Sequence, residues 1–311
     1  MLFVLSHHFL LPALFLTGFI AGTVDAIAGG GGLISLPALL SVGIPPHLAL
    51  GTNKLQSSFG TMMAAHSYYR QGLIDKQKLM LGLIFTLIGA LIGAVTIQIL
   101  NGDLLRQIIP ILLLVILIYT LLTPRLGHEE QKAKISERTF FVIFGFLLGF
   151  YDGFLGPGVG SLWVFAFIFF AGFRLIKATA YTKVFNLNTN LVALCCFAAA
   201  HNIDYRIGLC MGAGQLMGGR LGAYLAIKKG VELIRPIFIL VVAVTVTTLF
   251  YKNCLSTAHL FKTISFAAKM MISISLALGM ILIYFWKIRR QNHSFTKELK
   301  YVSQRDYLDI K

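Results

Sequence analysis

Long apolar runs recur along the whole chain and constrain its fold more than any other feature. A helix needs about 20 apolar residues to cross a bilayer core of about 30 Å, and several runs reach that length. Of the 311 residues, 57% are hydrophobic and only 13% are charged, about half the usual charged fraction. The sequence therefore predicts an all-α polytopic membrane protein. The runs cover residues 9–24, 55–69, 79–100, 108–123, 139–155, 160–173, 184–200, 207–227, 236–250 and 264–286.

The net charge of +15 does not indicate a nucleic-acid-binding protein. The basic residues are spread over short loops and a tail that follows residue 286. Charges at such positions orient membrane proteins and contact anionic lipid headgroups. We therefore expect membrane lipids, and no nucleic acid, as partners of these charges. The sequence leaves the oligomeric state open.

The chain also contains an internal repeat. The stretch "GFIAGTVDAIAGGGG" from Gly18 aligns with "GFLLGFYDGFLGPGV" from Gly145, at an offset of 127 residues. After a loop that is two residues longer in the second half, the offset becomes 129 residues, and Lys54 aligns with Lys183. Such internal symmetry is typical of membrane proteins built from two structural repeats. Each repeat is predicted to hold a Gly-broken hydrophobic hairpin and three transmembrane helices. These segments are 9–43 (broken), 46–70, 77–100 and 104–123, then 139–173 (broken), 176–200, 206–227 and 233–250, with one extra C-terminal helix at 264–286.

Loop charges predict that the two repeats have inverted topology. Loops rich in Lys and Arg face the cytoplasm, and corresponding loops in the two repeats carry opposite biases: 44–51 has no Lys or Arg, whereas 174–177 has two. Inverted repeats have this property. We expect the N-terminus outside and the C-terminus in the cytoplasm of a multi-pass inner (plasma) membrane protein, although loop 251–262 fits least well. The expected divisions are repeat 1 at 9–123, a cytoplasmic linker at 124–138, repeat 2 at 139–250, the extra helix at 264–286 and a basic cytoplasmic tail at 287–311.

Five charged residues fall inside the predicted membrane segments, where charge is costly and rarely idle. Asp25 aligns with Asp152 and Lys54 aligns with Lys183, whereas Arg220 has no charged counterpart. The lysines could instead extend to lipid headgroups, and the aspartates could cap or lock the helix breaks. An ion pair that fixes helix packing is the corresponding alternative for Arg220. We expect Asp25, Asp152 and Arg220 to be coupling or structural charges.

The stretch "DAIAGGGGLISLPALL" at 25–40 interrupts an apolar segment with four consecutive glycines. Four glycines favour a non-helical turn, which a membrane tolerates only where the backbone is buried in protein or lines a cavity. A helix that restarts after the glycines would direct its N–H groups and positive dipole end into the protein, where an anion can bind. The matching break in the second repeat is "GPGVGSL" at 156–162. A purely structural kink is the alternative.

Polar side chains also interrupt the helices that follow, in "TNKLQSS" (52–58) and "YTKVFNLNTN" (181–190). Asn186 and Asn190 share one helix face, although helix–helix hydrogen bonds could explain them. Together these features predict a cavity near the membrane midplane with positive helix ends, two lysines and amide donors, which suits a small oxyanion or carboxylate. The aspartates could carry a coupling proton or balance the lysines. The candidate substrate-binding residues are Gly29, Gly30, Gly31, Gly32, Asn53, Lys54, Gln56, Gly156, Gly158, Lys183, Asn186 and Asn190.

At these residues the sequence resembles the sulfite exporter TauE/SafE family of membrane transporters. The motifs that carry the resemblance are "DAIAGGGGLISLPALL", "GIPPHLALGTNKLQ" and "GFYDGFLGPGVGSLWV", and it covers roughly residues 10–286. The resemblance implies a bacterial inner-membrane carrier with two copies of one domain. It also implies small sulfur-containing or organic anions as substrates.

The predicted function is therefore a secondary transporter, with export as the expected direction, that moves small anions by alternating access. Sulfite, sulfoacetate and other organosulfur or organic acids are the candidate substrates. The sequence has no ATP-binding motif, no HExxH, GxSxG or paired-carboxylate motif, and no clustered metal ligands. We thus expect no enzyme activity, no catalytic residue, no cofactor and no metal site. The alternatives are an ion channel or a non-transporting membrane scaffold and, further behind, an intramembrane enzyme.

Overall fold

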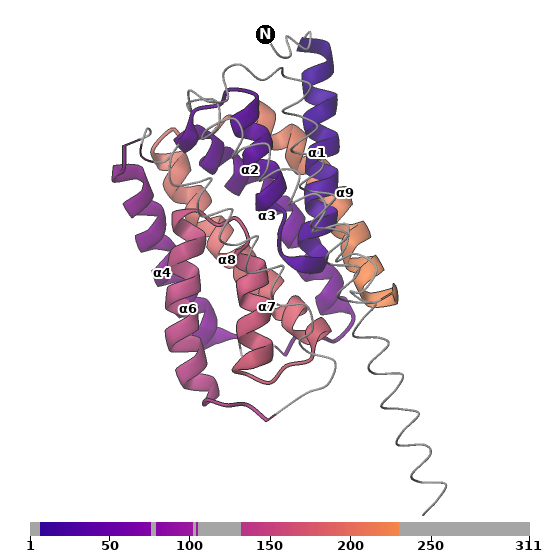
Figure 1. Ribbon diagram of the computed structural model, residues 1–311, viewed down its shortest axis with the longest axis vertical. Helices are drawn as coiled ribbons and strands as arrows, with labels where there is room; N and C mark the ends of the chain where they lie inside the picture. Colours follow the sequence, from indigo (N-terminus) through magenta and orange to yellow (C-terminus); the bar gives the residue numbers. More distant parts are fainter. Residues whose placement is uncertain (1–6, 76–78, 102–103, 105–131, 230–311) are drawn as a thin grey trace, which may run out of the picture.

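The computed structural model describes residues 7–75, 79–101, 104 and 132–229, which form eight α-helices and no strand (Figure 1). The all-α class is confirmed for this part of the chain. The helices predicted at 233–250 and 264–286, nearly all of 104–123, and the tail lie outside the described residues. The helices are α1 (His7–Ala28), α2 (Gly32–Ser41), α3 (Pro46–Arg70), α4 (Met80–Ile99), α6 (Glu137–Phe154), α7 (Val159–Phe169), α8 (Leu175–Ala199) and α9 (Tyr205–Lys229).

Two helix breaks interrupt the fold where the sequence predicts them. The chain leaves α1 at Gly29, with φ of +74°, and restarts as the short helix α2. It leaves α6 in the same way through Gly156 and Gly158, with φ of +90° and +78°, before α7. Glycine adopts such backbone angles without the steric cost that other residues meet. The glycines thus end one helix and let the next begin at once.

Helices from the two halves of the chain pack in matching pairs. Helix α1 lies along α9 at one side of the molecule, and α4 lies along α6 at the other (Figure 1). Between them α3 contacts α8, and these two also contact α9 and α4, respectively. Exchange of α1 with α6, α3 with α8 and α4 with α9 leaves this set of contacts unchanged. The core is therefore shared between the halves.

Glycines allow the outer helix pairs to approach closely. A Cβ atom at Gly89 of α4 would lie 2.3 Å from the carbonyl oxygen of Phe146, and one at Gly218 of α9 would lie 2.0 Å from that of Phe19. Small residues allow such close backbone packing in membranes, where helices lack a hydrophobic drive to associate. Both glycines and both phenylalanines are aligned pairs of the repeat, so the two interfaces are built in the same way.

Replacement of Gly218 by alanine should destabilise the α1–α9 pair, because the added methyl group would overlap a backbone carbonyl. Overpacking of this kind costs about 1–3 kcal/mol, which thermal unfolding of the purified protein in detergent would register as a lower midpoint. Gly145→Ala is the control, since the nearest neighbour of its Cβ would be the Phe85 side chain at 3.0 Å. Equal midpoints for the two variants would contradict the proposed close packing.

Charged residues are buried inside this fold, whereas large apolar side chains are exposed on its outer surface. Lys54 and Lys183 are 1% and 0% exposed, whereas Leu91 and Ile92 on α4 are 45% and 44% exposed. By length and composition, α4 and the Leu10–Ala28 part of α1 qualify as membrane spans. Helices α3 and α8 carry the buried lysines, which lower their hydropathy. An apolar exterior around a charged interior is the arrangement that a bilayer favours.

Aromatic side chains hold α7 against its neighbours. The rings of Trp163 and Phe167 stack on each other and on Phe185 of α8, with centroids 5.0–5.8 Å apart. Phe140 of α6 packs on Phe167 at 5.0 Å. Because such pairs add packing energy beyond area burial, they fix the short helix and therefore the position of its N-terminus.

Candidate functional site

The two helix breaks meet in the interior of the protein. A Cβ atom at Gly29 would lie 2.5 Å from Cα of Gly160, so the two backbones leave no room for a side chain between them. The Ser161 hydroxyl donates a hydrogen bond of 2.9 Å to the carbonyl oxygen of Ala28. Residues more than 130 positions apart in sequence thus bring the N-terminal ends of α2 and α7 to one place.

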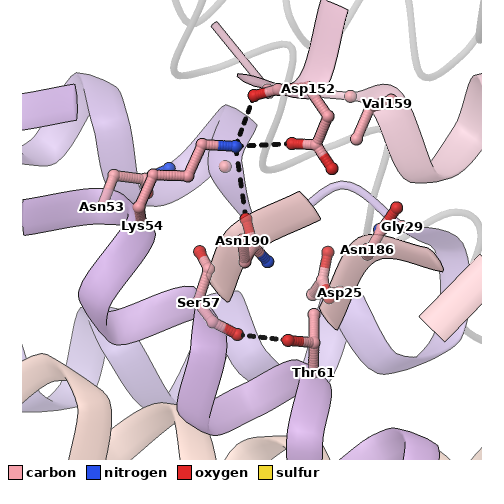
Figure 2. A pocket seen from close by; sticks show the side chains of 13 residues that line it. Asp25, Gly29, Asn53, Lys54, Ser57, Thr61, Asp152, Val159, Asn186 and Asn190 are labelled. Carbon is pink, nitrogen blue, oxygen red and sulfur yellow. Dashed lines mark hydrogen bonds and ion pairs between the residues drawn. The ribbon is translucent and has the colours of Figure 1, made fainter. Parts of the chain in front are cut away.

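Two buried ion pairs join the halves across this point. Lys54 Nζ donates to Asp152 Oδ1 at 2.6 Å, to the Asp152 carbonyl oxygen at 2.5 Å and to Asn190 Oδ1 at 3.2 Å (Figure 2). Lys183 Nζ donates to Asp25 Oδ2 at 2.9 Å. Each lysine is therefore neutralised by the aspartate of the other half, which compensates for the burial of both charges.

The surroundings of the two aspartates differ. Asp152 also accepts a hydrogen bond from the Thr189 hydroxyl, and its side chain is 3% exposed. Asp25 accepts the backbone N–H of Gly31 at 3.1 Å, and its side chain is 14% exposed. The residue that aligns with Thr189 is Gly60, which has no hydroxyl. Asp25 is thus more accessible, and no hydroxyl from the described residues donates to it.

A small cavity of about 20 Å³ lies beside these ion pairs, which is room for about one water molecule. Figure 2 shows lysine, aspartate and asparagine side chains around it, with Gly29 of the first break and Val159 of α7 nearby. Its wall combines the two helix breaks with the polar faces of α3 and α8. The lining residues are Asp25, Gly29, Gly32, Asn53, Lys54, Ser57, Thr61, Asp152, Gly156, Gly158, Val159, Asn186 and Asn190.

Several donors at this cavity have no partner within the described chain. The backbone N–H groups of Gly32 and Gly158, at the starts of α2 and α7, have no hydrogen-bond acceptor there. The side chain of Asn186 is 3% exposed, and its Oδ1 atom also lacks a partner. Because the two ends of an amide group can exchange places, Asn186 can direct its NH₂ group, a donor, into the cavity in place of Oδ1. Free N–H groups at the positive ends of two helices favour an anion.

The structure gathers most of the predicted site residues at this cavity. Eight of the candidate substrate-binding residues and both aspartates line it, and Lys183 lies behind Asp25. Gln56 is not in the wall but donates to Asn53 at 3.0 Å. Gly30 and Gly31 also lie outside the lining, and Gly31 binds Asp25 instead. Arg220 lies elsewhere, exposed on the surface between α3 and α9.

The sequence analysis did not identify Ser57, Thr61 and Val159 in the wall, nor Thr189 behind Asp152. A signal for two of them is present in the repeat. At the offset of 129 residues, Ser57 and Thr61 align with Asn186 and Asn190. The asparagines therefore have hydroxyl-bearing counterparts on the matching face of α3. The site has symmetric positions but different side chains on its two sides.

Within the described part of the chain, no group of three or more His, Cys, Asp or Glu residues could hold a metal ion. The polar groups at the cavity are two lysine–aspartate pairs, amides, hydroxyls and backbone N–H groups. This donor set can bind and release an anion by hydrogen bonds and charge.

Comparisons with known proteins identify relatives of this chain among membrane transporters. The "Probable membrane transporter protein YfcA" of Escherichia coli (strain K12) is 40% identical over 244 residues, which cover 78% of this chain and 91% of that protein. The "Probable membrane transporter protein ORF9" of Sinorhizobium sp is 41% identical over 237 residues, 76% of this chain and 90% of that protein. "YunE" of Bacillus subtilis (strain 168), another probable membrane transporter protein, is 24% identical over 267 residues, with 77% and 97% covered.

No solved structure matches the chain. The model of the family described as "Sulfite exporter TauE/SafE" matches residues 14–249, a range that contains both helix breaks and both ion pairs. The names of the family and of these relatives describe membrane transporters and not enzymes. The chain belongs to the TauE/SafE sulfite exporter family.

Proposed function

We propose that this protein is a secondary transporter that carries small anions across the plasma membrane by alternating access, with export as its direction. Sulfite, sulfoacetate and other small organosulfur or organic acids are the proposed substrates. The observation that carries the proposal is the cavity where two helix N-termini, free backbone N–H groups and Lys54 meet, with Lys183 behind Asp25. A small oxyanion fits this chemistry because it needs several donors and a balancing positive charge.

The proposed mechanism uses two repeats with inverted topology. The exchange of matching helices leaves the packing unchanged, and the two ion pairs exchange in the same way. Loop charges favour opposite orientations for the halves, with the N-terminus outside and the C-terminus in the cytoplasm. In inverted-repeat transporters, rocking of one half against the other opens a fixed central site to each side in turn.

The described conformation corresponds, on this proposal, to a closed state in which the site is too narrow for the substrate. A cavity of about 20 Å³ holds one water molecule and is too small for sulfite. Entry of an anion therefore requires the two breaks to separate and at least one aspartate to give up its lysine. A proton on the aspartate would free that lysine, and Asp25 is the better placed because its side chain is more exposed than that of Asp152.

Flux measurements with the full-length protein in proteoliposomes test this function. We expect saturable movement of radiolabelled sulfite or sulfoacetate that depends on the substrate gradient and responds to an imposed pH gradient. Currents that do not depend on a substrate gradient would instead identify an ion channel. Absence of flux for every small anion tested, with folded protein in the liposomes, would contradict the proposal.

Asn186→Ala should raise the KM for the transported anion while leaving the fold intact. A hydrogen bond to a charged ligand contributes about 1.5–3 kcal/mol, so we expect an increase of about 10- to 100-fold. The control is Asn188→Ala on the same helix. Asn188 donates to Thr86 Oγ1 at 2.8 Å and to the carbonyl oxygen of Leu83 at 3.0 Å, on α4. A similar KM for both variants would exclude Asn186 from the site.

A further inference from the structure

A second cavity, of about 810 Å³, lies on the surface between α3 and α9. We call it the α3–α9 groove. It shares no lining residue with the cavity at the helix breaks. Arg70 follows Thr61 by nine residues, which is two and a half turns of helix, so the two cavities lie on opposite faces of α3. The groove therefore requires its own explanation.

Three of the described residues that line the groove are cationic, Arg70, Arg220 and Lys228, and none of the described lining residues is acidic. Arg70 and Arg220 are exposed to it, and neither makes an ion pair or a hydrogen bond within the described chain. Lys228 donates to the Tyr224 hydroxyl at 2.9 Å, and no carboxylate in the described part of the chain pairs with it. His66 lies in the same wall. The groove thus presents positive charge that no residue in the described part of the chain balances.

Arg220 lies too deep to be explained as a loop charge. Gly208 faces Leu55 and Gly219 faces Gly60, so α9 runs in the same direction as α3. Arg70 and Lys228 therefore lie at the same end of the bundle, where basic residues are common. Arg220 precedes Lys228 by eight residues, or about 12 Å along the helix. Because no described residue pairs with Arg220, and an unpaired arginine at that depth is costly, an anion bound in the groove would stabilise it.

The fold itself does not need these charges. In the other half of the protein, the positions that align with Arg70, Arg220 and Lys228 are Ala199, Leu91 and Ile99. All three are exposed, and Leu91 and Ile99 are 45% and 80% exposed. The matching surface between α4 and α8 is therefore apolar. The positive charge is therefore specific to the α3–α9 groove, and the repeat does not reproduce it on the matching α4–α8 surface.

We propose that the α3–α9 groove binds the headgroup phosphate of an anionic phospholipid. Arg220 and Arg70 contact the phosphate oxygens, Lys228 contributes charge at the rim, and Met63 and Ile227 in the same wall contact the acyl chains. Basic pockets between transmembrane helices at the cytoplasmic side bind such headgroups. Only the assignment to the cytoplasmic leaflet rests on the orientation proposed above, because lipid binding here requires no transport activity.

Native mass spectrometry of the full-length protein tests the inference with phosphatidylglycerol as the probe and phosphatidylcholine as the neutral lipid. We expect wild type to retain phosphatidylglycerol selectively. Arg220→Leu, which installs the residue of the matching surface, should weaken that binding about fivefold, and the Arg70→Ala/Arg220→Leu double variant about 25-fold. Arg220→Lys keeps the charge and should bind nearly as well as wild type.

Arg174→Ala is the matched control, since Arg174 is an exposed arginine outside the groove, and it should bind phosphatidylglycerol like wild type. Thermal midpoints of all variants separate loss of lipid from loss of fold. Equal phosphatidylglycerol binding by wild type and the folded double variant would overturn the inference. Displacement of the lipid by millimolar inorganic phosphate would also overturn it, because the groove would then be a site for a free anion. Neither result depends on whether the protein transports sulfite.

Discussion

Lys54→Met should greatly reduce the amount of folded protein. The variant leaves Asp152 buried without its ammonium partner, and loss of one member of a buried ion pair costs about 3–5 kcal/mol. That is a large part of the total stability of about 5–15 kcal/mol that proteins usually have. Thermal unfolding in detergent and the yield of monodisperse protein would measure the loss. A variant as stable as wild type would show that the pair carries no buried charge.

A double variant separates stability from transport. Lys54→Met combined with Asp152→Asn removes both charges, so that neither is left buried without its partner, which is the costly case. We expect most of the lost stability to return while anion flux in proteoliposomes stays absent. Lys183→Met with Asp25→Asn is the matched test in the other half. Wild-type flux in either stable double variant would remove that lysine from the proposed mechanism.

Gly29→Ala should be the most damaging glycine substitution at the site. Its φ of +74° disfavours any side chain, and the new methyl group would lie 2.5 Å from Cα of Gly160. Left-handed backbone costs about 1–2 kcal/mol and backbone overlap about 1–3 kcal/mol more. We expect a thermal midpoint far below that of wild type, or no folded protein.

Gly43→Ala is the control for Gly29→Ala. Gly43 has a φ of +92°, but a Cβ atom there would meet nothing within 4 Å. It should therefore lose only the backbone contribution and remain folded and active. If Gly29→Ala lowered the midpoint no more than Gly43→Ala, the close contact between the two helix breaks would be wrong.

The helices were largely predictable because their ends carry local signals. The segment predicted at 46–70 forms α3 over Pro46–Arg70, where a proline suits the first turn of a helix. The two breaks were predictable because four glycines, or glycines beside a proline, have few alternatives in a membrane. The proline and the glycines that give these signals lie within a few residues of the helix ends that they determine.

The sequence did not predict which lysine forms an ion pair with which aspartate. The sequence shows that Lys54 aligns with Lys183, but alignment does not say which aspartate each lysine meets. That choice depends on how α3 and α8 pack against the opposite break, which no short stretch encodes. The surface position of Arg220 also depends on tertiary packing, because the glycines of α9 decide which of its faces α1 and α3 cover.

The crossed ion pairs have a consequence for how the protein is made. Asp152 follows Lys54 by 98 residues and Lys183 follows Asp25 by 158. The first half therefore enters the membrane during synthesis with an aspartate and a lysine whose partners in the folded protein have not yet been made. The insertion machinery must hold these helices near water or near itself for that interval. A first half synthesised alone should then be degraded, and one supplied with a separately synthesised second half should be rescued.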